Sequence, residues 1–324
     1  MYLVHYVFCL RTHIFIGVNY IRLLRLKEWA KNLFLFIPLF FAGELFSWDL
    51  YPKMILGVIA FCCIASCIYI INDYRDKEED KKHPEKKHRP LAAGTVSTTA
   101  AVIICVLLLI AGFFTAYFIR EKFLFVLAIY FVLNLAYSFG LKAVPVLDII
   151  IVAVGFVLRV KGGAVIAMIG VTEWLNIMIF LLSLFMAIGK RRDDVLLKIS
   201  SGADLRKSIK GYNLEFLNVA TSLVCAVIVV AYFMYTMSPE VQYRITHLGK
   251  SSQTNNNTAA YRLYYTCLFV LAGILRYLQI IFVQAQSGSP TKILYRDRFI
   301  QVTILLWIAS FYWIIYMPDK TIFK

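Results

Sequence analysis

The sequence predicts an all-α membrane protein that crosses the bilayer about nine times. Of its 324 residues, 60% are hydrophobic and only 16% are charged, and the mean hydropathy is +0.72. Apolar stretches recur that are long enough to cross a hydrocarbon core of about 30 Å, which takes roughly 20 helical residues. Backbone polar groups cannot remain unpaired in lipid, so these stretches are predicted to be helices.

Nine apolar segments follow one another along the chain. The five that contain no charged residue span 54–71, 96–119, 123–141, 216–237 and 299–317. The four that contain one to three charged residues span 33–46, 144–165, 173–188 and 263–283. Their alternation with charged connections predicts a polytopic helical bundle.

The distribution of basic residues predicts the orientation of this bundle. With the amino terminus in the cytoplasm, 23 of the 34 Lys and Arg residues fall in cytoplasmic segments and 8 on the opposite side. Such an excess is typical of cytoplasmic loops. The net charge of +15 then reflects topology and contact with anionic lipid headgroups, so no nucleic-acid partner is expected. We expect a multi-pass protein of the bacterial inner (plasma) membrane, and the sequence leaves homo-oligomerisation open.

An acidic motif directly follows the segment 54–71. Its polar members are Asn72, Asp73, Asp76 and Asp80. If the helix continues past the membrane boundary, Asn72, Asp76 and Asp80 recur every four residues on one face, with Asp73 adjacent. Like charges at this spacing repel, and a hard divalent cation such as Mg²⁺ would relieve the repulsion. The motif predicts a Mg²⁺-diphosphate site with the three aspartates as metal ligands. The alternative is a solvated charged loop that helps to set the topology.

A basic stretch, residues 81–94, comes immediately after the acidic motif. Its candidate phosphate ligands are Lys82, Lys86 and Arg89. Cations beside metal-binding carboxylates can bind the phosphate oxygens that a metal leaves free. This stretch therefore favours the diphosphate site over the charged loop.

Charged groups also occur inside or at the edge of apolar segments, where they are costly and tend to be functional. Arg159 lies eleven residues after Asp148, roughly three turns deeper in the same segment, so the two are not expected to pair. Arg159 is expected either to pair with a group on another helix or to hold an anionic substrate head. Lys31 opens the first segment at cytoplasmic depth, where it either contacts a lipid phosphate or extends to the interface.

These motifs resemble those of the UbiA superfamily of intramembrane prenyltransferases. The resemblance rests on the motif Asn72-Asp73-x-x-Asp76-x-x-x-Asp80, the Arg-Pro-Leu-Ala-Ala-Gly of residues 89–94, and stretches at 28–32, 136–142, 158–163, 183–191, 275–277 and 296–298. It covers nearly the whole chain and is closest to the decaprenyl-phosphate phosphoribosyltransferases of that superfamily. It implies one UbiA-like domain over residues 1–324, with cytoplasmic active-site loops at residues 72–97 and 189–212. It also implies substrate-binding roles for Tyr137 and Lys142.

The sequence departs from the family pattern in the loop after the sixth segment. Aromatic prenyltransferases of the superfamily usually carry a second acidic motif there, whereas this chain has Lys190, Arg191 and Arg192. Lys and Arg bind phosphate directly, which suits a substrate with additional phosphate groups. We expect Lys190 and Arg191 to bind substrate, and the alternative is a charge cluster that only sets topology.

The resemblance implies transfer of the 5-phosphoribosyl group from 5-phosphoribosyl 1-diphosphate to a polyprenyl (decaprenyl-like) phosphate, releasing diphosphate and giving a lipid-linked pentose donor. The two substrates and membrane lipids are the expected partners, and Mg²⁺ is the expected cofactor. The acceptor phosphate is already anionic at neutral pH, so no general base is needed. One alternative is an aromatic polyprenyltransferase of quinone or haem synthesis, but the missing second acidic motif counts against it. The other is a transporter, whose ionisable cluster would lie near the bilayer midplane.

Overall fold

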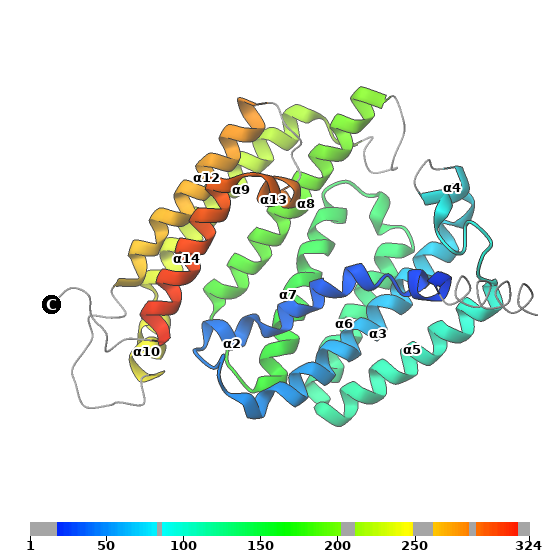
Figure 1. Cartoon of the computed structure of the whole chain (residues 1–324), viewed down its shortest axis with the longest axis horizontal. Coiled ribbons are helices and arrows are strands. Elements are labelled where there is room, and N and C mark those ends of the chain that lie inside the picture. Colours follow the sequence, from blue (N-terminus) through cyan, green and yellow to red (C-terminus); the bar gives the residue numbers. More distant parts are fainter. Residues whose placement is uncertain (1–17, 83–85, 202–210, 249–261, 285–289, 317–324) are drawn as a thin grey trace, which may run out of the picture. The chain divides into compact units, whose positions relative to one another are not determined.

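The computed structural model describes residues 18–82, 86–201, 211–248, 262–284 and 290–316, and every regular element in these ranges is a helix (Figure 1). Eight helices of the described residues are long and apolar enough to cross a membrane. They are η2 (Trp48–Leu50) with α3 (Tyr51–Arg75), α5 (Thr98–Ile119), α6 (Glu121–Ser138), α7 (Leu147–Ala167), α8 (Glu173–Ser201), α9 (Leu214–Met237), η6 (Arg262–Thr266) with α12 (Cys267–Phe282), and α14 (Arg298–Tyr316). The predicted all-α, polytopic class is confirmed.

Several of these helices begin where a polar side chain satisfies free backbone amides. The hydroxyl of Ser97 accepts from the Ala100 amide at 3.2 Å at the start of α5. The side-chain carbonyl of Asn213 accepts from the Phe216 amide at 2.7 Å at the start of α9. Such N-caps fix where a helix can start. Arg120, in extended conformation, separates α5 from α6.

The first expected segment differs from the other eight. It consists of η1 (Leu26–Phe36) and α2 (Ile37–Phe41), of 11 and 5 residues. Gly43 ends α2 with φ +74, a left-handed conformation that favours glycine. The Glu44 amide then donates to the Leu39 carbonyl at 2.9 Å, the bond of a Schellman cap. Because the helix ends at this turn, η1 and α2 together are shorter than the roughly 20 residues that a membrane-spanning helix needs.

The chain divides into two compact units. Unit 1 comprises Met1–Ile37, Asp49–Leu141 and Leu158–Met168, and unit 2 comprises Pro38–Trp48, Lys142–Val157 and Ile169–Lys324. The expectation of a single domain over residues 1–324 stays a prediction.

Unit 1 is built on α3, which lies side by side with α5 (Figure 1) and also contacts α6 and η1. Its core includes the fully buried rings of Phe61 and Phe123, with centroids 5.8 Å apart. At Gly163 of α7, a Cβ atom would lie 1.9 Å from the Leu35 carbonyl oxygen. Only glycine therefore allows the backbones of α7 and η1 to approach this closely. The remaining elements are α4 (Lys77–Lys82) and η3 (Lys86–His88).

Unit 2 contains two pairs of packed helices, α8 with α9 and α12 with α14. Its core includes Leu217, fully buried, and the edge-to-face pair of Phe185 and Tyr277, with centroids 4.7 Å apart. The shorter elements are η4 (Leu141–Ala143), which precedes α7, α10 (Pro239–Leu248), which follows α9, and α13 (Pro290–Arg296), which lies between α12 and α14.

Candidate functional site

The acidic motif lies in unit 1, where α3 is followed by α4. Helix α3 ends at Arg75, Asp76 caps it, and α4 begins at Lys77. Helical bonding continues across this join, because the Asp76 amide donates to the Asn72 carbonyl at 2.9 Å and the Asp80 amide to the Asp76 carbonyl at 2.7 Å. The spacing of four thus corresponds to successive helical hydrogen bonds. The Asn72 side-chain amide also donates to the Asp76 carboxylate at 3.1 Å.

The other two carboxylates of the motif are buried and bound to arginines. The side chains of Asp73 and Asp80 are 2% and 4% exposed. Arg89 donates to both, at 3.0 and 2.7 Å, and Arg25 donates to Asp73 at 2.5 Å. The Arg25 guanidinium also lies over the Tyr69 ring, 4.8 Å from its centroid. The buried carboxylates of Asp73 and Asp80 thus both bind the Arg89 guanidinium. Buried charges need such partners, because they have lost their contacts with water.

The donor set of the motif fits a hard divalent cation. Carboxylate and amide oxygens are the ligands that Mg²⁺ prefers, and usually one or two carboxylates bind it together with substrate phosphates. In the part of the chain that the structure describes, no three Asp, Glu, His or Cys side chains are grouped so that they could hold a metal ion by themselves. Positive charge is nevertheless already concentrated between Asp73 and Asp80 by Arg89. A cation at this place would take over the carboxylates from the arginine.

The other ligands predicted in unit 1 lie on α4, η3, η1 and α6. Lys82 is exposed at the end of α4, and Lys86 is half-buried in η3, where its carbonyl accepts from the Arg89 amide at 2.9 Å. Lys31 forms an ion pair with Glu28 on the same face of η1. Tyr137 is half-buried in the last turn of α6. Among the predicted ligands, Arg89 is bound to two carboxylates of the motif, those of Asp73 and Asp80.

Arg159 is buried within unit 1 and bound to groups on other elements, which is one of the two alternatives expected for it. Its role in substrate binding stays a prediction. Its Nε donates to the Asn32 side-chain oxygen at 2.9 Å, and an Nη donates to the Tyr130 hydroxyl at 2.7 Å. The guanidinium also lies over the Tyr130 ring, 4.7 Å from the centroid. Asn32, in turn, is fully buried. Arg159 therefore ties α7 to η1 and α6 in the interior of unit 1.

This arrangement predicts the effect of replacing Tyr130 by Phe. The ring and its cation–π contact remain, but one charge-assisted hydrogen bond is lost, which costs about 1–2 kcal/mol in a membrane protein. Thermal unfolding in detergent should show a lower midpoint for Tyr130→Phe than for Tyr117→Phe, whose ring is 59% exposed. Equal midpoints for the two variants would show that the Arg159 contact does not stabilise the protein.

In unit 2, Asp148 is the centre of a second polar cluster. It is fully buried. Arg191 donates from Nε to one of its oxygens at 2.6 Å, and the Tyr212 hydroxyl donates to the other at 2.6 Å. Burial, followed by the hydrogen bond to Asp148, raises the pKa of Tyr212. Asp148 is therefore paired with Arg191 and not with Arg159, in agreement with the predicted separation of Asp148 and Arg159.

The three consecutive cations of α8 differ in their surroundings. Arg191 is 3% exposed and Arg192 is 4% exposed, whereas Lys190 is exposed. Arg192 donates to the Asn218 side-chain oxygen at 2.8 Å and to the Ile281 carbonyl at 3.1 Å. Of the two cations expected to bind substrate, Arg191 is buried by its contact with Asp148 and Lys190 is exposed. Their roles in substrate binding stay predictions. Lys142, the other cation predicted in this unit, is half-buried in η4.

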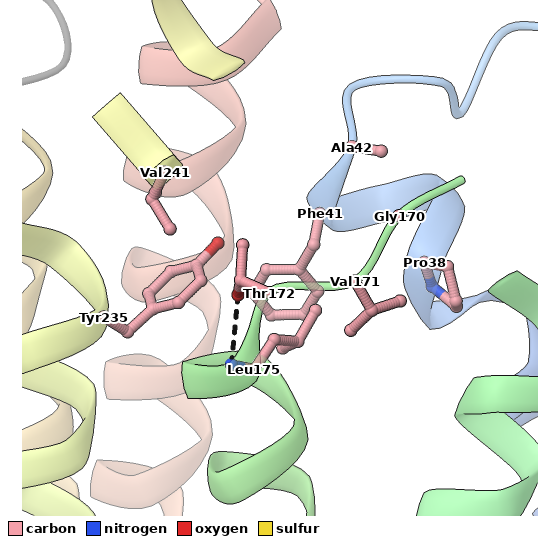
Figure 2. A pocket seen from close by; sticks show the side chains of 9 residues that line it. All are labelled: Pro38, Phe41, Ala42, Gly170, Val171, Thr172, Leu175, Tyr235 and Val241. Atoms are coloured by element: carbon pink, nitrogen blue, oxygen red, sulfur yellow. Dashed lines mark hydrogen bonds between the residues drawn. The ribbon is translucent and has the colours of Figure 1, made fainter. Parts of the chain in front are cut away.

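Unit 2 also contains a pocket (Figure 2). All the residues that line it are uncharged, and they include Phe41, Thr172, Leu175 and Tyr235. Leu175 precedes Lys190 by fifteen residues of α8, which is roughly 22 Å along a helix. An anionic substrate group would find no charge complement in this pocket.

Comparison with known proteins identifies the family. Residues 33–199 match the UbiA prenyltransferase family. The chain belongs to this family. The decaprenyl-phosphate phosphoribosyltransferase of Mycolicibacterium smegmatis is 34% identical over 294 residues, which cover 90% of each protein. The enzyme of that name from Corynebacterium glutamicum is 30% identical over 301 residues, covering 92% of this chain and 86% of the relative.

A solved UbiA structure shares the fold. The UbiA homologue from Archaeoglobus fulgidus bound to GPP and Mg²⁺ superposes with a TM-score of 0.62 at 22% identity, covering 92% of this chain and 99% of that one. The predicted UbiA-like bundle is thereby confirmed. A UbiA protein is an integral, multi-pass membrane protein, which agrees with the eight membrane-spanning helices of the described residues.

Sequence reasoning missed the long-range partners of the charged groups in this UbiA chain. Arg25 lies 48 residues before its partner Asp73, and Asp148 lies 43 residues before Arg191. The sequence did contain one signal: the charged residue Asp148 is embedded among apolar residues. Buried charges need partners, but spacing along the chain does not say which partner each one takes.

Proposed function

We propose that the chain transfers the 5-phosphoribosyl group from 5-phosphoribosyl 1-diphosphate to a polyprenyl phosphate, releasing diphosphate. The observation that carries this proposal is the match, over 90% of both chains, to a relative named decaprenyl-phosphate phosphoribosyltransferase. The combination of an acidic motif in unit 1 with Lys190, Arg191 and Arg192 in place of a second acidic motif supports it. Such cations suit a donor that carries a 5-phosphate as well as a diphosphate.

The acceptor phosphate is the nucleophile of the proposed reaction. Its oxygen forms a bond to the anomeric carbon while the bond from that carbon to diphosphate breaks, so the configuration inverts from α to β. The nucleophile is anionic, so no side chain has to remove a proton. The main task of the protein is to stabilise charge on the leaving diphosphate.

We assign the diphosphate to the acidic motif of unit 1. Asp73, Asp76 and Asp80, with Asn72, would hold Mg²⁺, which supplies charge neutralisation to the departing diphosphate. With Mg²⁺ held by the carboxylates, Arg89, which pairs with Asp73 and Asp80 in the structure, would bind phosphate oxygens through its planar fork.

The other predicted ligands bind the remaining anionic groups. Lys82 and Lys86 lie near Arg89 in the chain and contact the diphosphate, and Lys31 contacts the lipid phosphate. Arg159 supplies a buried positive charge that attracts the anionic substrate head.

The remaining assignments concern Tyr137 of unit 1, the cations of unit 2 and the face of the membrane. Tyr137, at the end of α6, contacts the substrate. Lys142, Lys190 and Arg191 supply positive charge for phosphate. These groups act on the cytoplasmic face of the bacterial inner membrane, which agrees with the excess of basic residues on that side.

The alternative, an aromatic polyprenyltransferase, shares the UbiA family but would use a polyprenyl diphosphate as donor. A transporter is a weaker alternative, because a UbiA transferase relationship extends over nearly the whole chain.

Chelation of the metal tests the proposal. Protein purified in detergent is incubated with ribose-labelled 5-phosphoribosyl diphosphate, polyprenyl phosphate and Mg²⁺, and the lipid fraction is counted. We expect labelled lipid that disappears on adding EDTA and returns with excess Mg²⁺. Transfer that persists in EDTA would refute the metal assignment, and no labelled lipid under any condition would refute the transfer.

A further inference from the structure

Two cysteine side chains of unit 1 meet between the neighbouring helices α3 and α5. The Sγ atoms of Cys67 and Cys105 are 2.8 Å apart, and both residues are free thiols. The Cys105 thiol also lies 3.8 Å from the Cys67 backbone carbonyl oxygen. A disulfide bond is about 2.05 Å long, so its formation requires the sulfurs to approach by less than about 1 Å.

The packing of the two helices holds the thiols in this position. A Cβ atom on Gly112 of α5 would lie 3.2 Å from the carbonyl oxygen of Ala60 in α3. Cys67 follows Ala60 by seven residues, and Cys105 precedes Gly112 by seven. Seven residues are close to two helical turns, so the two contacts belong to one antiparallel register of α3 against α5. The helix backbones, and not a single side-chain rotamer, therefore bring the sulfurs together.

The two thiols lie inside membrane-spanning helices and differ in exposure. Cys67 is 1% exposed, whereas Cys105 is half-buried. The next residues of α5, Val106 and Leu107, are exposed, and the exposed apolar face of a membrane-spanning helix contacts lipid. Cys105 lies seven residues into α5, which is roughly 10 Å along the helix. An oxidant dissolved in the bilayer can therefore reach Cys105, away from the soluble reductants that keep cytosolic thiols reduced.

We propose that Cys67 and Cys105 form an oxidation site, at which a lipid hydroperoxide converts the two thiols to a disulfide that links α3 to α5. A reachable thiol next to a resolving thiol is the arrangement of such sites. Neither cysteine is assigned to a substrate or to the metal, so this proposal does not rest on the proposed function.

The oxidation takes place in two steps. The Cys105 sulfur first attacks the hydroperoxide, the O–O bond breaks, and the Cys105 sulfenic acid and a lipid alcohol are formed. The Cys67 sulfur then attacks the Cys105 sulfur, the S–O bond breaks, and the disulfide forms with release of water. Both thiol protons leave in the alcohol and the water, and the two electrons reduce the peroxide.

Peptide mapping of the protein in vesicles tests the proposal. The full chain is reconstituted into phospholipid vesicles that contain phospholipid hydroperoxide, the remaining thiols are alkylated, and peptides are identified by mass spectrometry without reductant. We expect nearly complete loss of both thiols and a linked peptide, containing Cys67 and Cys105, that separates on reduction. Tetrathionate, a charged oxidant confined to water, should leave both thiols free.

Two variants separate this pair from the other cysteines. Cys63→Ser is the control, because Cys63 lies on the same helix and is half-buried, and it should form the linked peptide as the wild type does. In Cys67→Ser the resolving thiol is missing, so the Cys105 sulfenic acid should accumulate and be trapped by dimedone.

Absence of the linked peptide in wild-type protein treated with hydroperoxide would overturn the proposal. Loss of the Cys63 thiol at the same rate, or equal oxidation by tetrathionate, would also contradict it. If Cys67→Ser does not fold, Cys105→Ser replaces it: Cys67 should then remain a free thiol, and its oxidation would refute the order of the two steps.

Discussion

Replacing Asp73 by Asn should reduce phosphoribosyl transfer at least about 100-fold, because one carboxylate of a metal-diphosphate site is lost. Asp73 is the carboxylate bound by both Arg25 and Arg89. Its amide counterpart has the same shape, but it does not provide the negative charge that holds a divalent cation. The measurement is kcat/KM for labelled 5-phosphoribosyl diphosphate at saturating Mg²⁺.

Glu78→Gln is the control for this change. Glu78 lies in the neighbouring α4, its side chain is 76% exposed, and its ion pair with Lys81 is on the surface. Lys81 lowers the pKa of Glu78 through that hydrogen bond, but exposed pairs of this kind contribute little. We expect kcat/KM to remain within about two-fold of wild type in this variant. Full activity of folded Asp73→Asn protein would remove the acidic motif from the reaction.

Replacing Gly163 by Ala should give the largest loss of stability among single methyl additions to unit 1. The new Cβ atom would lie 1.9 Å from the carbonyl oxygen of Leu35, a backbone atom that cannot move without shifting η1. Overpacking typically costs about 1–3 kcal/mol, and we expect a value at or above the upper end because the opposing atom is backbone. Arg159 of α7 would also be displaced from Asn32 of η1. The measurement is the thermal midpoint and the yield of monodisperse protein in detergent.

Gly273→Ala provides the comparison for this glycine. A Cβ atom there would meet Thr303 Oγ1 at 3.5 Å, an ordinary contact. Alanine also favours a helix over glycine by roughly 1 kcal/mol. Gly273→Ala should therefore be neutral or stabilising. If Gly163→Ala behaves like Gly273→Ala, the close approach of α7 to η1 is not present in the folded protein.

The sequence predicted the helices well because a bilayer allows few alternatives. Long charge-free stretches such as that of α5 must form helices in lipid, and their length alone defines the span. The first segment was harder to predict. The left-handed turn at Gly43 ends α2 early, and hydrophobicity alone contains no information about such a turn.

The candidate site was predictable in composition but not in pairing. The spacing of four from Asn72 to Asp76 and Asp80 follows from local helical geometry, so the motif could be recognised in the sequence. Arg191 of α8 is buried against Asp148 of α7, which lies 43 residues earlier in the chain. This contact depends on how the two helices pack. Consecutive cations look alike in a sequence, and only tertiary contacts separate Lys190 from its two buried neighbours.

The choice between donors tests the central claim most directly. Purified protein is given 5-phosphoribosyl diphosphate, polyprenyl phosphate, polyprenyl diphosphate and an aromatic acid acceptor together with Mg²⁺, and the lipid products are identified by mass spectrometry. We predict that polyprenyl-phosphoryl-5-phosphoribose accumulates together with one equivalent of diphosphate. A prenylated aromatic product without the phosphoribosyl lipid would contradict the assignment and favour an aromatic polyprenyltransferase.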